Sequence, residues 1–169
     1  MSGPRKTAIV TGASQGIGAG IVKAFVERGF DVVANSRKVT QSAQVAASDH
    51  VALVEGHIGE PAIAAKIVET AMTRFKSIDV LVNNAGIFFT KPFTEYTAED
   101  FKSLVLTNVE GFLYVTQLSI RQMLAQKTGG SIVTLTAALA RNPIRGVTAA
   151  VPMLTKGGLE TITQHLAME

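Results

Sequence analysis

The sequence predicts an α/β domain, spanning residues 1–169, in which helices cover both faces of an open, doubly wound parallel sheet. Short apolar runs alternate with segments of helical period, and one glycine-rich stretch joins the first such run to the first helix. In addition, 47% of the residues are hydrophobic and only 17% are charged, which suits a sheet buried on both faces. Alternating strands and helices fold into right-handed βαβ units. We expect the strand order 3-2-1-4-5, with a ligand at the carboxyl ends of the strands around the switch point between strands 1 and 4.

Five strands are expected from short runs that are rich in β-branched and apolar residues. They span residues 7–10, 31–35, 51–54, 78–82 and 131–136. No repeat, low-complexity tract or linker interrupts the alternation, so a single domain is expected.

Four helices are expected between and after these strands. The first follows the glycine-rich stretch and ends just before Gly29, which suits the position after a helix end. Pro61 suits the first position of the second helix. Thr97 and Asp100 resemble a capping pair at the start of a long third helix. The third helix spans about residues 98–126, and the fourth runs from about residue 150 to residue 169.

Composition narrows the classes of function. No apolar run approaches the roughly 20 residues of a membrane span, and residues 1–6 lack the apolar segment of a signal peptide, so we expect a soluble, cytoplasmic protein with no membrane partner. Zero cysteines exclude disulfides and thiolate catalysis, and three scattered histidines predict no metal site. A net charge of +3 without a long basic run does not indicate nucleic-acid binding.

Residues 11–18, TGASQGIG, form a tight turn between a strand and a helix. Glycine allows backbone torsions and close approaches that a Cβ would forbid, and it leaves amide N–H groups at the helix N-terminus. Such amides can bind a phosphate, whereas the alternative is a purely structural turn. The lysine and hydroxyl residue of GxxxxGK[ST] are absent, so an NTPase is not indicated.

This stretch matches the TGxxxGxG fingerprint, and residues 83–86 match the NNAG signature, of the short-chain dehydrogenase/reductase family. Asn108 and residues 156–158 fit as well, so the chain resembles the family over essentially its whole length. The resemblance implies a Rossmann-like fold that holds a nicotinamide dinucleotide. It also implies hydride transfer between that cofactor and a small alcohol or carbonyl substrate, and a homo-oligomer, either dimer or tetramer.

The resemblance places the cofactor on the glycine-rich stretch and at the ends of strands 2 to 4. The pyrophosphate is expected on the amides of residues 14–17, and the adenosine ribose beside residues 84–86. Near the adenine, where the family often has an aspartate, this chain has His57 and Ile58. The expected cofactor contacts are Gly12, Ser14, Gln15, Gly16, Ile17, Gly18, Ser36, Arg37, His57, Ile58, Asn84, Ala85, Gly86 and Lys156.

The end of strand 2 bears on the choice between NADP and NAD. An acidic residue there would bond the ribose 2′-hydroxyl and repel a 2′-phosphate. This chain has Ser36 and Arg37 instead, followed by Lys38. Because a guanidinium can hold a phosphate with two parallel hydrogen bonds, NADP is expected rather than NAD. The alternative is that Arg37 is a solvated loop residue.

The catalytic residues of the family are only partly present. In the family, a tyrosine passes a proton to the substrate oxygen, and a lysine four residues later lowers the tyrosine pKa and holds the ribose. Lys156 is present, but the tyrosine position is Pro152, which has no proton to give. Thr136 offers a hydroxyl or is simply a β-branched strand residue. Asn108 is either a family-like proton relay or a polar residue that relieves the long helix where it bends.

Two functions therefore remain open. The first is an NADP-dependent oxidoreductase whose mechanism is altered, or whose activity is weak, because of Pro152. The second is a non-catalytic NADP(H)-binding module, such as a sensor or an assembly subunit. Family members continue into a sixth and a seventh strand that are absent from this sequence, so the chain is expected to be part of a longer protein. Strand 5 is then expected to be an exposed edge.

Overall fold

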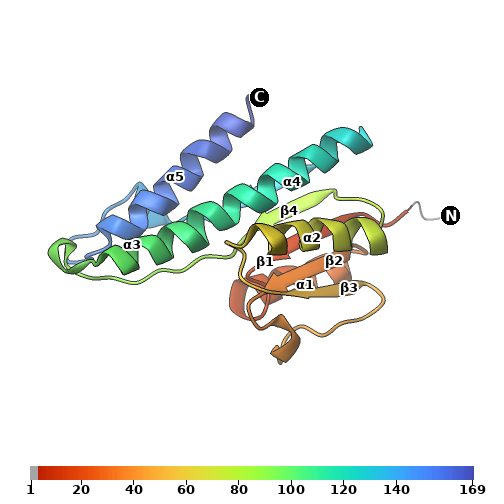
Figure 1. The fold of residues 1–169 in the computed structure, drawn as a ribbon, viewed down its shortest axis with the longest axis horizontal. Helices are drawn as coiled ribbons and strands as arrows, with labels where there is room; N and C mark the ends of the chain where they lie inside the picture. Colours follow the sequence, from red (N-terminus) through yellow and green to blue (C-terminus); the bar gives the residue numbers. More distant parts are fainter. Residues whose placement is uncertain (1–3) are drawn as a thin grey trace.

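Five parallel strands form one sheet in the order β3-β2-β1-β4-β5, which confirms the predicted topology. The computed structural model describes residues 4–169 (Figure 1). The strands are β1 (Thr7–Thr11), β2 (Asp31–Ser36), β3 (Val51–Glu55), β4 (Val80–Asn83) and β5 (Ser131–Thr134). The last two are shorter than predicted, because β5 pairs only along the four residues of β4, from Val80 opposite Ser131 to Asn83 opposite Thr134.

Three helix ends follow the predicted signals, whereas the last helix ends at Leu166 and not at residue 169 as predicted. Gly29 has a φ of +81° after the end of α1, Pro61 is the first residue of α2, and Thr97 and Asp100 form a capping box at the start of α3. Within residues 4–169, no helix has both the length and the apolar character needed to cross a bilayer. The helices are α1 (Gly16–Glu27), α2 (Pro61–Arg74), α3 (Ala98–Leu104), α4 (Gly111–Gln126) and α5 (Ala150–Leu166).

The long helix predicted for residues 98–126 is continuous but not uniformly α-helical. A π-helical segment, Val105–Glu110, joins α3 to α4. A π segment widens the helix by one residue per turn, often at a functional site. The sequence period did not reveal it, and it contains the buried Asn108.

Helices cover both faces of the central strand, β1. Ile9 packs in one apolar cluster with Ile67 of α2 and Val115 of α4, whereas Val10 packs in a second cluster with Val22 of α1. Burial on both faces accounts for the uninterrupted apolar run in β1. Figure 1 shows α5 alongside the helix formed by α3 and α4.

The crossover from β2 to β3 has no α-helix, so the predicted alternation is incomplete there. It contains only the 3₁₀ turn Val39–Gln41. The Ser42 hydroxyl fixes the loop by donating to the carbonyl oxygen of Ser14 at 2.6 Å and accepting the N–H groups of Gln44 and Val45. The loop is therefore bonded to the glycine-rich stretch.

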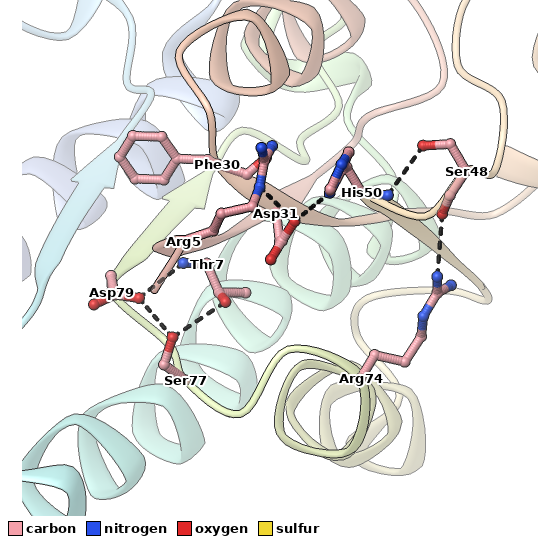
Figure 2. Close-up of polar contacts among 9 residues, drawn as sticks. All are labelled: Arg5, Thr7, Phe30, Asp31, Ser48, His50, Arg74, Ser77 and Asp79. Atoms are coloured by element: carbon pink, nitrogen blue, oxygen red, sulfur yellow. Dashed lines mark hydrogen bonds and ion pairs between the residues drawn. The ribbon is translucent and has the colours of Figure 1, made fainter. Parts of the chain in front are cut away.

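Charged side chains connect the amino ends of the strands (Figure 2). Asp31 accepts a hydrogen bond from Arg5 Nε at 2.9 Å, and its Oδ1 lies 2.8 Å from Nδ1 of His50. Asp79 accepts the backbone N–H of Thr7 at 2.8 Å. These contacts tie the starts of β1, β2 and β4 together at the edge opposite the carboxyl ends.

β5 is an edge strand, as expected. Among the described residues it pairs with β4 alone, and the side chain of Val133 is 48% exposed. Its other backbone edge is therefore open to pairing or to cover by further structure.

Candidate functional site

A cavity of about 480 Å³ lies at the carboxyl ends of β1 to β4. It occupies the predicted position around the switch point between β1 and β4. The predicted contacts that line it are Gly12, Ser14, Gln15, Ser36, Arg37, His57, Ile58, Ala85 and Gly86. Lys38, which follows Arg37, lines it as well. It is also lined by Asn35, Gly56, Ile87 and Thr107, which were not predicted although each is the chain neighbour of a predicted residue.

The glycine-rich stretch forms a close-packed turn at one end of this cavity. Gly12 has a φ of +66°, and a Cβ there would lie 2.8 Å from the Cα of Ala85. A Cβ on Gly18 would overlap the carbonyl oxygen of Gly12. Gly16 also has a positive φ, +56°, but a Cβ there would meet nothing within 4 Å. The turn thus needs Gly12 and Gly18 for packing, and space is open beside Gly16.

Five predicted contacts do not line the cavity: Gly16, Ile17, Gly18, Asn84 and Lys156. Ile17 is 68% exposed at the start of α1, and the amide of Gly16 donates to Oε1 of Gln44 at 3.2 Å. Gly18 packs against the turn behind the cavity. Asn84 uses its side-chain amide to bond the carbonyl oxygens of residues 11 and 12 at 2.9 and 3.0 Å. Asn84 therefore fastens the end of β4 to the turn.

Two buried polar atoms belong to cavity-lining residues and have no hydrogen-bond partner among the described residues: Oδ1 of Asn35 and Oγ of Ser36. The Nδ2 group of Asn35 is satisfied, since it donates to the carbonyl oxygens of Val54 and Gly56 at 2.9 and 3.3 Å. A buried polar atom without a partner costs about 1–3 kcal/mol, so a polar ligand or an ordered water at this wall would be favourable.

The wall beyond β2 is basic. Arg37 and Lys38 are exposed, and neither forms an ion pair within the described part of the chain. His57 lies on the next wall, where its Nδ1 accepts the N–H of Gly59 at 3.1 Å and its Nε2 lies 3.4 Å from the hydroxyl of Thr107. The glycine turn, the unpartnered oxygens and the basic wall together fit an elongated, phosphate-bearing ligand such as a dinucleotide.

Lys156 and Asn108 converge on Gly86, at the end of β4. A Cβ on Gly86 would lie 2.8 Å from Nζ of Lys156 and 3.2 Å from Oδ1 of Asn108. Lys156 is only 9% exposed, and its Nζ donates to the carbonyl oxygen of Leu135 at 3.0 Å. Burial lowers the pKa of Lys156 below its ordinary value. The ammonium group therefore lies beside Gly86, which lines the cavity, although Lys156 itself is not one of the lining residues.

Asn108 joins three parts of the chain. Its Oδ1 accepts the N–H of Ile87 at 2.8 Å, and its Nδ2 donates to the carbonyl oxygen of Ile87 and to Oγ1 of Thr155 at 3.1 and 2.9 Å. Thr155 in turn donates to the carbonyl oxygen of Pro152. Asn108 thus lies in an irregular helical segment, as its structural interpretation requires, and positions the loop after β4 against α5. The relay role stays a prediction.

Neither tyrosine replaces the phenol that Pro152 lacks. Pro152 is buried in the first turn of α5. The hydroxyl of Tyr96 donates to the carbonyl oxygen of Phe89 at 3.0 Å, and that of Tyr114 donates to Glu110 at 3.0 Å. Both hydroxyl protons are engaged in bonds that hold local structure.

The prediction placed Thr136 within the fifth strand, and this is wrong. Thr136 lies two residues beyond the end of β5. Its side chain is exposed and forms no hydrogen bond with the described residues. The hydroxyl is therefore free to bond a ligand.

A model of the short chain dehydrogenase family matches residues 6–169 of this sequence. The chain belongs to the short-chain dehydrogenase family. It is 36% identical over 170 residues to an uncharacterized oxidoreductase of Methylorubrum extorquens, covering 97% of this chain and 66% of that protein. It is 34% identical over 170 residues to L-xylulose reductase of Bos taurus, covering 97% of this chain and 65% of the reductase.

Solved structures of the family share the fold. The crystal structure of 3-ketoacyl-(acyl-carrier-protein) reductase from Brucella melitensis, complexed with NADH, superimposes with a TM-score of 0.90 at 30% identity. The match covers 98% of this chain and 70% of that one. This short-chain dehydrogenase therefore has the Rossmann-like sheet of its family, and it spans about two thirds of the length of the curated relatives described above.

Proposed function

We propose that this short-chain dehydrogenase is an NADP-dependent oxidoreductase that transfers a hydride between the cofactor and a small alcohol or carbonyl substrate. The observation that carries the proposal is the 480 Å³ cavity, whose walls hold most of the residues that the family motifs select. L-xylulose reductase and a reductase complexed with NADH among the similar proteins support a redox activity with a nicotinamide cofactor.

NADP rather than NAD is proposed because of the wall beyond β2. Arg37 and Lys38 line the cavity where an acidic residue would repel a 2′-phosphate. We expect Arg37→Glu to weaken NADP binding at least tenfold and to change NAD binding little, because it replaces a phosphate ligand with a like charge. Calorimetric titration of both cofactors measures this, with Arg28→Ala, at the far end of α1, as the control. Equal losses for both cofactors would contradict the assignment.

The chain supplies the groups that hold and orient the reactants. The amides of residues 14–17 would hold the pyrophosphate, and Lys156 would bond the nicotinamide ribose beside Gly86. The nicotinamide, when bound, supplies or accepts the hydride. Asn108 fixes Ile87 and α5 on the two sides of that position. The hydroxyl of Thr136 is available to bond the substrate oxygen.

Pro152 favours a second candidate, a non-catalytic NADP(H)-binding module. A proline at the tyrosine position removes the proton donor on which the family relies. This alternative predicts that NADPH binds with ordinary affinity and that no substrate is turned over. It also predicts that Pro152→Tyr introduces the missing phenol and with it measurable activity.

One experiment separates the candidates. NADPH oxidation is followed by absorbance with a panel of aldehydes and ketones, and NADPH binding is measured by fluorescence titration on the same protein. Turnover above the enzyme-free rate supports the oxidoreductase. Binding without turnover on any substrate supports the module, and absence of binding to both NADPH and NADH contradicts both.

A homo-oligomer is proposed with the α3–α4 helix and α5 as the interface. Phe101 and Leu106 on the first, and Leu154 and Ile162 on the second, are exposed apolar side chains that support such a contact. Sedimentation velocity tests it, and a monomer at micromolar concentration would contradict it. The cytoplasmic location expected from the sequence stays a prediction.

A further inference from the structure

We propose that Lys156 itself donates the proton that completes carbonyl reduction in this protein. The inference rests on the proposed oxidoreductase function and goes beyond it, because the family resemblance gives the lysine only a supporting role beside a tyrosine. Here Pro152 stands in the tyrosine position, and the proton must come from another group.

The other proton donors near the site are engaged or remote. The Tyr96 hydroxyl donates a hydrogen bond to the carbonyl oxygen of Phe89, and the Glu110 carboxylate that accepts a hydrogen bond from the Tyr114 hydroxyl raises the pKa of Tyr114. His57 lies at the end of β3, with both ring nitrogens near partners. The remaining histidines, His50 and His165, lie beside Asp31 at the opposite edge of the sheet and in the last turn of α5.

Thr136 is free but is not an adequate acid. A threonine hydroxyl does not ionise near neutral pH, so it can donate a hydrogen bond to a substrate oxygen but cannot give up its proton to it. Thr136 follows Leu135, whose carbonyl oxygen accepts the hydrogen bond from the Lys156 ammonium group.

Lys156 retains unused donor capacity at the site. An ammonium group has three N–H donors, and the Nζ of Lys156 has one hydrogen-bond acceptor among the described residues, the carbonyl oxygen of Leu135. No carboxylate of the described chain pairs with it: Glu160, one turn further along α5, is paired with Arg141. The remaining N–H groups can therefore face a ligand beside Gly86.

The environment of Lys156 also suits proton transfer. Burial lowers the pKa of its ammonium group, which makes it a stronger acid than an exposed lysine and brings its titration closer to neutral pH. The hydrogen bonds of Asn108 to Ile87 and Thr155 hold the preceding residue of α5, and thus limit movement of Lys156.

Reduction adds a hydride to the carbonyl carbon, which the reduced cofactor supplies, and a proton to the carbonyl oxygen. The π electron pair of the carbonyl forms the new O–H bond as an Nζ–H bond of Lys156 breaks. The products are the alcohol, the oxidised cofactor and a neutral Lys156 amine, which then takes a proton from solvent.

Lys156→Arg tests the step while keeping a positive charge and hydrogen-bond donors. Because a guanidinium does not release its proton in this pH range, we expect NADPH-dependent carbonyl reduction to fall by roughly a hundredfold or more. The Kd for NADPH, from fluorescence titration, should change less than about threefold if binding contacts persist. Lys66→Arg, on the outer surface of α2, is the matched control and should retain the wild-type rate.

Amine rescue of Lys156→Ala separates proton donation from positioning. We expect added primary ammonium ions to restore part of the rate of carbonyl reduction. The restored rate should depend on the pKa of the added amine. Acetic anhydride labelling of wild-type Lys156, read by mass spectrometry over pH, gives a readout independent of activity and should show titration below the ordinary pH range of a lysine side chain.

These outcomes decide the inference. Full activity in Lys156→Arg, rescue that is independent of amine pKa, or titration of Lys156 in the ordinary range of a lysine side chain would overturn it while leaving the oxidoreductase function intact. If the wild-type protein binds NADPH but reduces no carbonyl, the proposed function itself fails, and this inference with it.

Discussion

A buried lysine without a carboxylate partner is the unusual residue of this molecule. Lys156 is held by one backbone carbonyl, and the loss of solvent lowers its pKa. Its presence was predicted from the family motif, and so was the absence of the tyrosine. Its burial and its single acceptor were not, because they depend on how α5 packs against the ends of β4 and β5.

This burial predicts a pH dependence of stability. The folded pKa of Lys156 lies below the value of about 10.4 for an unfolded lysine. Between these two pKa values the unfolded chain binds more protons, so the free energy of unfolding rises with pH. We expect wild type to gain stability relative to Lys156→Met as pH rises through this window, measured by urea unfolding. A difference that is constant with pH would refute the burial of the ammonium group.

Motifs predicted most of the cavity because they record backbone constraints. Gly12 was predicted from the fingerprint, and its positive φ and contact with Ala85 show why no side chain fits. Asn35 and Thr107 were missed because nothing in a local pattern distinguishes a strand-end amide or a helical hydroxyl that faces a cavity. Asn84 belongs to the motif, but its side-chain amide bonds the turn and does not line the cavity.

The start of α1 depends on its first glycines in different ways. A Cβ on Gly18 would overlap the backbone of Gly12 and lie 2.7 Å from Nδ2 of Asn84, whereas a Cβ on Gly20 would meet nothing within 4 Å. Of these two helix glycines, only Gly18 is required by the close approach of helix and turn.

This contrast gives a matched pair of variants. We expect Gly18→Ala to lower the free energy of unfolding by about 1–3 kcal/mol, because backbone atoms must move apart. Gly20→Ala should raise it by about 0.5–1 kcal/mol, because alanine is the better residue in a helix interior. Urea unfolding of the two variants measures both effects. If both variants were equally stable, the close packing of the turn would be wrong.

Two irregular segments lay beyond prediction. The π-helical segment Val105–Glu110 has an apolar pattern compatible with an α-helix, and its widening accompanies the tertiary bonds of Asn108. The crossover after β2 has no helix, and it is held through the Ser42 hydroxyl on Ser14. Such contacts join residues far apart in the chain and leave no local period.

The carboxyl ends and the amino ends of the strands have different roles. The carboxyl ends form the cavity, and the amino ends are joined by Asp31, Asp79 and their partners (Figure 2). The strand order was predictable because alternating strands and helices leave few topologies. The network at the amino ends was not, since charged residues at strand ends are common.

This division predicts that stability and binding can be separated. Asp79→Ala removes the acceptor of the Thr7 amide and of the Ser77 hydroxyl. We expect it to lower the free energy of unfolding by about 2 kcal/mol and to leave the Kd for NADPH unchanged. Asp49→Ala, an exposed residue, is the control for charge removal. If Asp79→Ala lost NADPH affinity under conditions in which the variant is fully folded, the amino ends of the strands would also affect binding at the carboxyl ends.

The reaction that we propose for this protein is hydride transfer between a nicotinamide cofactor and a carbonyl group, beside Gly86 and Lys156. It is tested most directly by incubating the protein with NADPH that carries deuterium at the transferable position of the nicotinamide and with the carbonyl panel. Mass spectrometry of the alcohols then detects the label. We expect one deuterium on the former carbonyl carbon of each alcohol molecule formed. Products without deuterium, or no product above the enzyme-free control, would contradict it.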